Sequence, residues 1–269
     1  MVPVSPSALS PTCHPSPVLW LWPGQAIYAG PALGLGPHAG SVACLAVGLD
    51  APFRVRAGDG AVCVRARTAL IAPRVRHLLT AEGDRMLFCY LDPASARRSA
   101  CEQRMTGGRA PVLTGHRDEH ALLTLAADLH LASGARRWLD RAAPDAPAGP
   151  DQRIRAVTAL LLDETHRTVM AAEGAAICGL SLSRFLHLFK THTGTSFRRY
   201  RLWARMIAAG RTISAGGDLT RAAAEAGFAT PSHFSAAFHR MFGLQPGRLL
   251  ATGLTIADAS ETPLPKERP

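Results

Sequence analysis

The spacing of hydrophobic positions divides this chain into a strand-rich first part and a helix-rich second part. Between about residues 27 and 91, short runs rich in Val, Leu and Ile are separated by Gly, Pro and Asp. Runs such as FRVRAGD partly alternate apolar and polar residues, which is typical of half-buried strands. Several short strands at this spacing predict a small β-sandwich or β-barrel.

The helical spacing begins near residue 119. Leu122, Leu125 and Leu129 recur at steps of three and four, which predicts one helix over residues 119–141. This helix either pairs with a second copy of the chain or packs on the barrel. The stretch APDAPAGP at residues 143–150 cannot continue a helix because of its prolines, so we expect a linker there. Apolar residues at helical spacing then recur through residues 151–250, which predicts several helices there.

The pattern therefore predicts an α+β protein of two domains. The expected divisions are a disordered leader at 1–24, a β-barrel domain with helices at 25–142, the linker at 143–150, an all-α domain at 151–250 and a flexible tail at 251–269. The leader lacks the charged start and continuous apolar stretch of a signal peptide. No apolar run reaches the length of a membrane span, so we expect a cytoplasmic protein with no membrane partner.

Two stretches of the helical region share one layout. They are residues 175–194 and 223–243, and each has a small-residue helix, a Gly, an apolar residue, a Ser or Thr, and an amphipathic helix that ends before a Gly. Gly179 and Gly227 permit a positive φ at a tight turn. Ser181 in the first unit, and Thr230 or Ser232 in the second, are suited to cap the helix that follows the turn. The repeat predicts two helix-turn-helix units.

A long basic helix is expected between the two units, over residues 196–214. The chain has a net charge of +10, and residues 153–248 alone hold thirteen Lys and Arg against five Asp and Glu, a balance of +8. Such a segment favours a polyanion as partner, because each neutralised phosphate releases counterions. A solubilising surface is the alternative that composition alone leaves open.

The helical region resembles the DNA-binding domain of the AraC/XylS family of bacterial transcription regulators. The matching landmarks, in this order, are Phe189-Lys190, Gly194-Thr195-Ser196-Phe197, Tyr200, Ala226-Gly227-Phe228, Ser232-His233-Phe234, Phe242-Gly243 and Pro246. The resemblance implies a sequence-specific DNA-binding transcription regulator that is not an enzyme. It implies double-stranded promoter DNA as partner, with RNA polymerase, a small-molecule effector and a second copy of the chain as further partners.

The chain departs from the family pattern at a few positions. Ala171 and Gly174 stand where larger aliphatic residues are usual, which we expect to weaken packing in the first unit. Ala236 stands where Arg is common, and Met206 follows Arg205 where Leu is usual.

By position, the resemblance assigns two sets of residues to DNA. The base-reading candidates are Ser183, Leu186, His187, Ser232, His233 and Ala236. The phosphate candidates are Arg184, Lys190, Arg198, Arg199 and Arg240. Two alternatives stay open, since Ser232 is also suited to cap a helix and Leu186 to lie in the core.

The strand-rich region resembles the cupin-like sensor domain found at the N-terminus of many such regulators. The matching segments are YAGPALGLGPHAGSVACLAVGLDAPFRVR and ALIAPRVRHLL with FCYLDPAS. The resemblance implies a small barrel that binds a ligand or a protomer, and His38 and His77 are the effector-binding candidates.

A cupin-type metalloenzyme, or a small-molecule-binding protein with an accessory helical domain, is the alternative function. A metal-dependent cupin needs converging ligands, typically a His-x-His pair with a carboxylate, and the chain has no His-x-His. We therefore expect no metal, no cofactor and no catalytic residue. The six cysteines include no Cys-x-x-Cys pair and are expected to be buried thiols.

Overall fold

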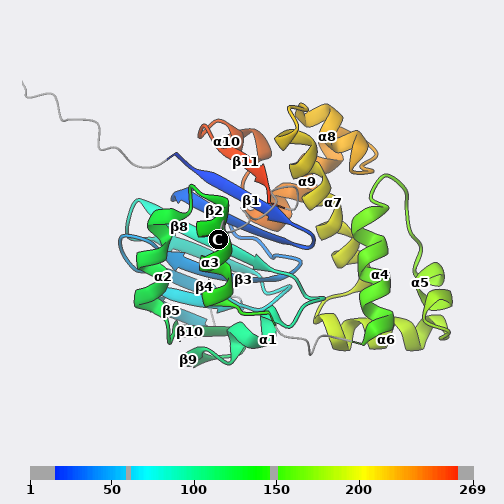
Figure 1. Cartoon of the computed structure of the whole chain (residues 1–269), viewed down its shortest axis with the longest axis horizontal. Helices are drawn as coiled ribbons and strands as arrows, with labels where there is room; N and C mark the ends of the chain where they lie inside the picture. The colour runs from blue at the N-terminus through cyan, green and yellow to red at the C-terminus, as the bar shows by residue number, and fades with distance from the viewer. Residues whose placement is uncertain (1–15, 59–61, 146–150, 260–269) are drawn as a thin grey trace, which may run out of the picture.

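The computed structural model describes residues 16–58, 62–145 and 151–259. A β-rich N-terminal part is followed by a helical C-terminal part, which confirms the predicted α+β class (Figure 1). The strands are β1 (Val18–Trp22), β2 (Gln25–Pro31), β3 (Ala43–Gly48), β4 (Phe53–Ala57), β5 (Val62–Ala66), β6 (Thr68–Ile71), β7 (His77–Ala81), β8 (Arg85–Leu91), β9 (Met105–Arg109), β10 (Val112–His116) and β11 (Thr255–Asp258).

The helices begin with α1 (Arg97–Glu102), α2 (Glu119–Leu125), a 3-10 turn (Ala126–Asp128) and α3 (Ala132–Ala142). The helical part contains α4 (Gln152–Asp163), α5 (Ala171–Ile177), α6 (Leu182–Thr193), α7 (Phe197–Ser214), α8 (Leu219–Glu225), α9 (Pro231–Phe242) and α10 (Pro246–Leu250). Of the helices in the described ranges, none combines the length and apolar character that crossing a membrane requires.

The described strands form two sheets that share an apolar core. The larger sheet has the order β11-β1-β2-β8-β3-β6-β10-β9, and the smaller has the order β5-β4-β7. Phe53 and Val55 of the smaller sheet pack with Ala46 and Phe88 of the larger one. Alternation along β4 explains this, because its buried residues face that core while Arg54 and Arg56 face solvent.

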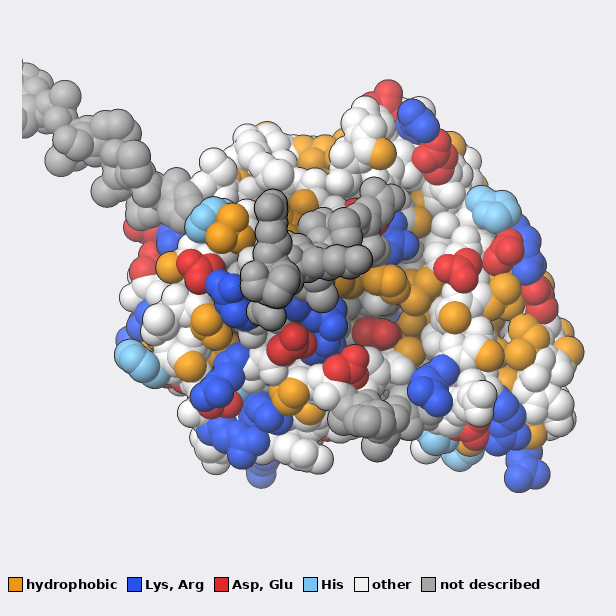
Figure 2. Space-filling model, viewed as in Figure 1, with side chains coloured by type: hydrophobic (Ala, Val, Ile, Leu, Met, Phe, Trp, Pro, Cys, Tyr) orange, Lys and Arg blue, Asp and Glu red, His pale blue; other side chains and the backbone are white. Residues whose placement is uncertain are grey.

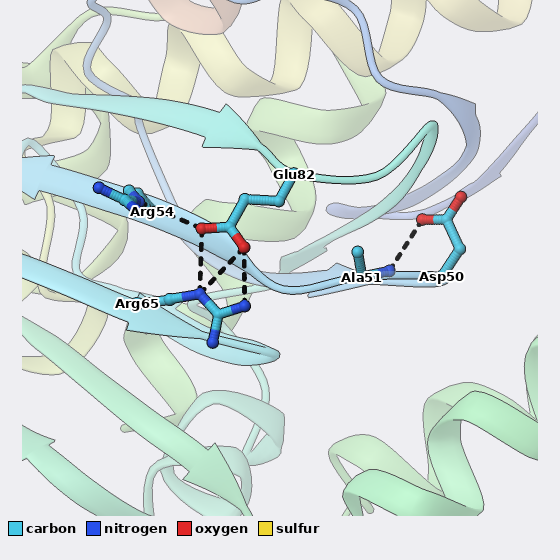
Figure 3. Close-up of polar contacts among 5 residues, drawn as sticks. All are labelled: Asp50, Ala51, Arg54, Arg65 and Glu82. Carbon is cyan, nitrogen blue, oxygen red and sulfur yellow. Dashed lines mark hydrogen bonds and ion pairs between the residues drawn. The ribbon is translucent and has the colours of Figure 1, made fainter.

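An ion-pair cluster lies on the solvent face of the smaller sheet (Figure 3). Arg65 donates hydrogen bonds to both carboxylate oxygens of Glu82, and Arg54 donates one at 3.1 Å. These bonds lower the pKa of Glu82 to about 2. At the neighbouring turn, the Asp50 carboxylate accepts from the backbone amide of Ala51. Arg54 and Arg65 are therefore both paired with one carboxylate at their own sheet.

The helical stretch over residues 119–141 is broken, which corrects the prediction of one continuous helix. It consists of α2, the 3-10 turn and α3, and both helices cover one face of the larger sheet (Figure 1). Trp20 Nε1 donates to the Leu129 carbonyl at 2.7 Å, so that carbonyl is bound by the sheet at the break. Trp138 Nε1 donates to the Leu122 carbonyl at 2.9 Å and fixes α3 against α2. The broken helix packs on the sheet, one of the two predicted alternatives.

The two ends of the chain also differ from the prediction. Residues 18–22 of the expected leader form β1, and residues 255–258 of the expected tail form β11. The two strands pair in parallel, from Val18 opposite Thr255 to Leu21 opposite Asp258. Each of these strands pairs with a strand from the opposite end of the chain, and the local spacing of hydrophobic residues does not reveal such a pairing. The remaining leader (1–15), residues 146–150 of the linker and the tail beyond 259 lie outside the described residues, and the domain division stays a prediction.

Four of the cysteines are buried thiols, as predicted; they are Cys44, Cys89, Cys101 and Cys178. Cys63 is exposed, which corrects the prediction for that residue, because it lies on the solvent face of β5. Cys13 lies outside the described residues.

α7 carries most of the contact between the helical part and the larger sheet. Trp203, Met206 and Ile207 of α7 share one apolar core with Leu21 and Ala26 of the β1–β2 hairpin. Trp203 Nε1 donates to the Gly24 carbonyl at 2.7 Å.

Two polar contacts supplement this core. The Tyr200 hydroxyl donates to Asp92 Oδ1 at 3.3 Å, and Ser214 Oγ donates to the Ile256 carbonyl in β11 at 2.9 Å. The larger sheet and α7 are therefore joined by a continuous apolar core with hydrogen bonds along its length.

Asp92 makes this contact dependent on pH. Burial raises the pKa of Asp92 to about 7, so the folded protein favours the protonated acid. A raised folded-state pKa contributes stability that is complete below about pH 4, and that stability is lost as the pH rises through about 7.

We predict that Asp92→Asn removes this pH dependence, because Asn is neutral at every pH and has the same shape. Urea unfolding of both proteins between about pH 5 and pH 8 measures it. The free energy of unfolding of the wild type should fall relative to that of the variant as the pH rises. Parallel curves for the two proteins would contradict the role given to Asp92.

Candidate nucleic-acid interface

The first helix-turn-helix unit consists of α5, a tight turn and α6. Gly179 has a φ of 63° at the turn, a value that favours glycine, as predicted. Ser181 caps α6, since its side chain accepts from the Arg184 amide at 3.4 Å. Phe185 and Phe189 of α6 are fully buried beneath α5 and α4.

Gly174 does not leave a gap in this unit, which corrects the expectation of weakened packing at that position. A Cβ added at Gly174 would lie 2.6 Å from Cζ of Phe185, so the ring occupies the space of the missing side chain. The glycine and the phenylalanine form a matched pair.

The second unit repeats the arrangement with α8 and α9. Gly227 has a φ of 72°, and Thr230 caps α9 by accepting from the His233 amide at 3.0 Å. Thr230 therefore performs the capping that was the alternative role for Ser232. Phe234 is buried, while Phe238 and Phe242 are half-buried and contact the larger sheet.

All six base-reading candidates lie on α6 and α9, and all six are exposed. They are Ser183, Leu186, His187, Ser232, His233 and Ala236. Leu186 is 39% exposed, so it is not a core residue. Their roles toward DNA bases remain predictions.

The first unit also exposes apolar side chains beside its reading face. Figure 2 shows hydrophobic side chains gathered around α5, toward the right edge of the view. Met170, Ile177 and Leu182 are 60%, 47% and 47% exposed. The exposed surface of this unit is therefore less polar than the basic composition of the region suggests.

A cleft lined with arginines lies between α7, α9 and the β-rich part; we call it the arginine cleft. It has a volume of about 730 Å³. Its charged and titratable lining residues are Arg76, Arg198, Arg199, Arg201, Arg205, Arg240, His38, His233 and His239. It therefore contains three of the five phosphate candidates, whereas Arg184 and Lys190 are exposed on α6.

The arginines of the cleft are not balanced by carboxylates. Within the described ranges, none of its six arginines forms an ion pair. Burial, followed by repulsion from Arg74 and Arg198, lowers the pKa of Arg199. Burial and the charge of Arg201 lower that of Arg205 in the same way. An anion entering the cleft would relieve this repulsion.

Two arginines of α7 are held in place by neutral oxygen atoms. Arg201 Nη1 donates to the Val169 carbonyl at 2.7 Å, and Arg205 Nη2 donates to Thr168 Oγ1 at 3.1 Å. These bonds orient the guanidinium groups without cancelling their charge.

His38 and His77 are brought together, although they lie far apart in the sequence. Their rings lie 4.3 Å apart, and their backbones exchange two hydrogen bonds, of 3.0 and 2.9 Å. The Nδ1 atom of His38 lies 2.9 Å from the Gly36 carbonyl, and that of His77 lies 2.8 Å from the Val75 carbonyl. A carbonyl only accepts, so each Nδ1 carries a hydrogen.

Burial also keeps these two rings neutral. It lowers the pKa of His38 to about 4, with the neighbouring His77 as a second cause, and it lowers the pKa of His77 as well. Across the described ranges, no group of three or more His, Cys, Asp and Glu side chains is arranged to hold a metal ion. The pair forms part of the packing between the β-rich part and α9.

An apolar cavity, which we call the interdomain cavity, lies where the larger sheet meets α7 and α9. It has a volume of about 90 Å³. Its lining includes Leu21, Tyr28 and Tyr90 from the sheet and Trp203, Phe238 and Phe242 from the helices. The spacing of hydrophobic residues does not reveal this cavity. It marks Phe238 and Phe242 as an apolar face of α9 but does not identify the sheet that this face contacts.

Comparisons with known proteins agree with this geometry. A family model described as a helix-turn-helix domain matches residues 175–252. No curated protein matches the chain.

Solved structures of one regulator, ToxT from Vibrio cholerae, are similar over both parts of the chain. An apo form of ToxT that carries a single substitution is 12% identical with a TM-score of 0.58, and the match covers 85% of this chain and 97% of that one. ToxT bound to (E)-4-(8-methylnaphthalen-1-yl)but-3-enoic acid is 12% identical with a TM-score of 0.55, covering 85% and 99%. Unsaturated fatty acid-bound ToxT is 10% identical with a TM-score of 0.50, covering 88% and 93%. These likenesses establish a shared two-domain fold.

The matched segment spans the second half of α5 through α10 and contains both turns and both capped helices. Residues 175–252 form a helix-turn-helix domain, and the resemblance of this segment to the DNA-binding domain of the AraC/XylS family is confirmed.

Proposed function

We propose that this protein is a sequence-specific transcription regulator whose helices α6 and α9 enter two successive segments of the DNA major groove. The observation that carries the proposal is the pair of capped helix-turn-helix units joined by the unbroken α7. A rigid connector fixes the separation of the two helices. The spacing that suits one face of B-DNA is about 34 Å, one helical turn.

The candidate residues of the two units divide by chemistry into two roles. Ser183, His187, Ser232 and His233 carry hydrogen-bonding groups suited to base edges, whereas Leu186 and Ala236 suit only the thymine methyl group. Arg184, Lys190, Arg198, Arg199 and Arg240 are suited to phosphates, which position the protein without specifying sequence.

We predict that His187→Ala relaxes sequence choice. A base contact distinguishes one duplex from another by about 1–3 kcal/mol, so affinity for a selected fragment should fall by that amount while affinity for random duplex stays near wild type. Lys190→Gln, on the same helix, is the matched control and should weaken binding to both duplexes equally. Fluorescence anisotropy with both duplexes at one salt concentration measures this.

Two outcomes of that measurement would count against the proposal. A uniform loss in His187→Ala would make His187 a positioning residue. Equal affinity of the wild type for the selected and the random duplex would contradict sequence-specific binding altogether.

The N-terminal domain is proposed to sense a small molecule through the interdomain cavity. The cavity is lined almost wholly by apolar side chains and lies between the larger sheet and a recognition helix. ToxT, which shares the fold, has been solved with an unsaturated fatty acid and with a naphthyl-substituted butenoic acid, both largely apolar molecules. These features favour an apolar or amphiphilic effector.

The small volume of the cavity suggests how such a ligand would act. Drug-sized ligand sites are typically about 300–1,000 Å³, well above the size of this cavity. A ligand would therefore bind better when α9 moves away from the sheet, and binding would shift the position of that helix. RNA polymerase and a second copy of the chain remain further proposed partners.

We predict that oleic acid binds to the wild type and that Leu33→Phe, which adds bulk to the cavity wall, weakens this binding about tenfold or more. Leu131→Phe is the control, because Leu131 is exposed and lies outside the cavity, and this variant should bind oleic acid as the wild type does. Isothermal titration calorimetry at two temperatures should also give a negative heat-capacity change. Equal affinity of all three proteins would contradict the cavity as the site.

A cupin-type metalloenzyme is the less supported function. Each candidate histidine directs Nδ1 toward a backbone carbonyl, and no carboxylate or thiol completes a ligand set with them among the residues that the structure describes. Elemental analysis of the purified protein tests it, since stoichiometric metal that is lost on changing His38 and His77 would favour the enzyme.

A further inference from the structure

The arginine cleft has a third wall that does not belong to the helix-turn-helix domain. α7 supplies Arg198, Arg201 and Arg205, and α9 supplies His233 and Arg240. The third wall is a loop segment of the β-rich part, residues 37–41, together with Arg76. The cleft is therefore formed only when the two parts of the chain are together.

Backbone hydrogen bonds fix this third wall to the end of α9. The Gly36 amide donates to the Gly243 carbonyl at 2.8 Å, and the Ala39 amide donates to the Arg240 carbonyl at 3.2 Å. Gly243 ends α9 with a φ of 78°, and a Cβ there would lie 2.5 Å from the Gly36 carbonyl oxygen, so glycine permits the close approach. The β-rich part thus has a defined position beside the second recognition helix.

A second arginine of the β-rich part lies near the same cleft. The charge of Arg74 acts on Arg199 of α7 and contributes to lowering its pKa. Arg74 has a φ of 68°, a left-handed backbone that is uncommon outside glycine, and its amide donates to the Gly40 carbonyl at 2.9 Å. The turn before β7 therefore places two arginines, Arg74 and Arg76, on the α7 side of the molecule.

These two arginines differ from the paired arginines of the same domain. Arg54 and Arg65 are paired with Glu82, as Figure 3 shows. Neither Arg74 nor Arg76 forms an ion pair within the described part of the chain, and both are exposed. This turn therefore carries two arginines without an ion pair, and α7 carries four more on the other side of the cleft. Together they form a surface suited to an extended anion.

We propose that the N-terminal domain itself binds the DNA backbone, with Arg74 and Arg76 contacting phosphates of a strand that runs along the arginine cleft. The cleft is continuous with the exposed face of α9, since His233 and Arg240 belong to both. A duplex seated on α9 therefore brings its backbone to the mouth of the cleft. The inference rests on the proposed function, and it adds the sensor domain to the DNA-binding surface.

In this proposal, the contact between the loop of the β-rich part and the end of α9 directly affects affinity for DNA. Arg74 and Arg76 reach the backbone only while the loop at residues 36–39 remains bonded to the end of α9. An effector that separates the larger sheet from α9 would withdraw both contacts at once, whatever it does to the recognition helices.

The double variant Arg74→Gln with Arg76→Gln tests the proposal in the full-length protein. The double variant Arg54→Gln with Arg65→Gln is the matched control, because it removes the same charge from the same domain outside the cleft. Affinity for a selected fragment and for a random duplex is measured by fluorescence anisotropy across a salt series. Thermal unfolding of each variant verifies that the fold is retained.

The expected result is a shallower dependence of log affinity on log salt for the Arg74/Arg76 variant. Each phosphate contact contributes about 0.9 to this slope, so two contacts should reduce it by about 1.8, equally for both duplexes. The control variant should keep the wild-type slope.

The possible contrary results separate this inference from the proposed function. A wild type that binds DNA while the Arg74/Arg76 variant keeps the wild-type slope would overturn the inference and leave the proposed function standing. An equal loss of slope in the control variant would also overturn it, since the effect would then reflect total charge. A wild type that binds no duplex would overturn both.

Discussion

α7 packs against the β1–β2 hairpin, and the Trp203 indole donates to the Gly24 carbonyl inside an apolar core to which both parts of the chain contribute. Removal of this helix from the sheet would expose Leu21 and Ala26 together with Trp203, Met206 and Ile207. Burial of apolar surface is the dominant favourable contribution to such a contact. Because α7 also connects the two helix-turn-helix units, the same contact positions the helix-turn-helix domain against the β-rich part of the chain.

Two features of opposite character follow from that arrangement. On one side of α7, the sheet and α9 enclose the apolar interdomain cavity; on another, α7 and α9 form the arginine cleft with a loop of the β-rich part. Both depend on the distance between α9 and the sheet. In the proposed function, a change in that distance would alter the effector site and the phosphate-binding cleft together, which is the linkage that a ligand-responsive regulator needs.

The helix-turn-helix units could be predicted from sequence because their determinants are local. Gly179 and Gly227, the capping Ser181 and the spacing of phenylalanines all act within each short repeat. The candidate reading faces could be predicted for the same reason, although the sequence did not distinguish Thr230 from Ser232 as the cap of α9.

Features that depend on long-range contacts could not be predicted. β1 and β11 are paired across nearly the whole chain, the indole of Trp20 donates to a carbonyl at the break before α3, and His38 meets His77 through a bridge between distant segments. Phe238 and Phe242 show the same limit, because helical spacing identifies an apolar face without identifying the sheet that covers it. The interdomain cavity and the third wall of the arginine cleft arise from such contacts.

In the proposed function, both units, held by α7, bind one face of a duplex. Hydroxyl-radical footprinting of the full-length protein on a fragment selected from random DNA tests this arrangement. Two protected segments are expected on the same face, about one helical turn (roughly 10 base pairs) apart. A single protected segment, or two segments on opposite faces, would contradict it.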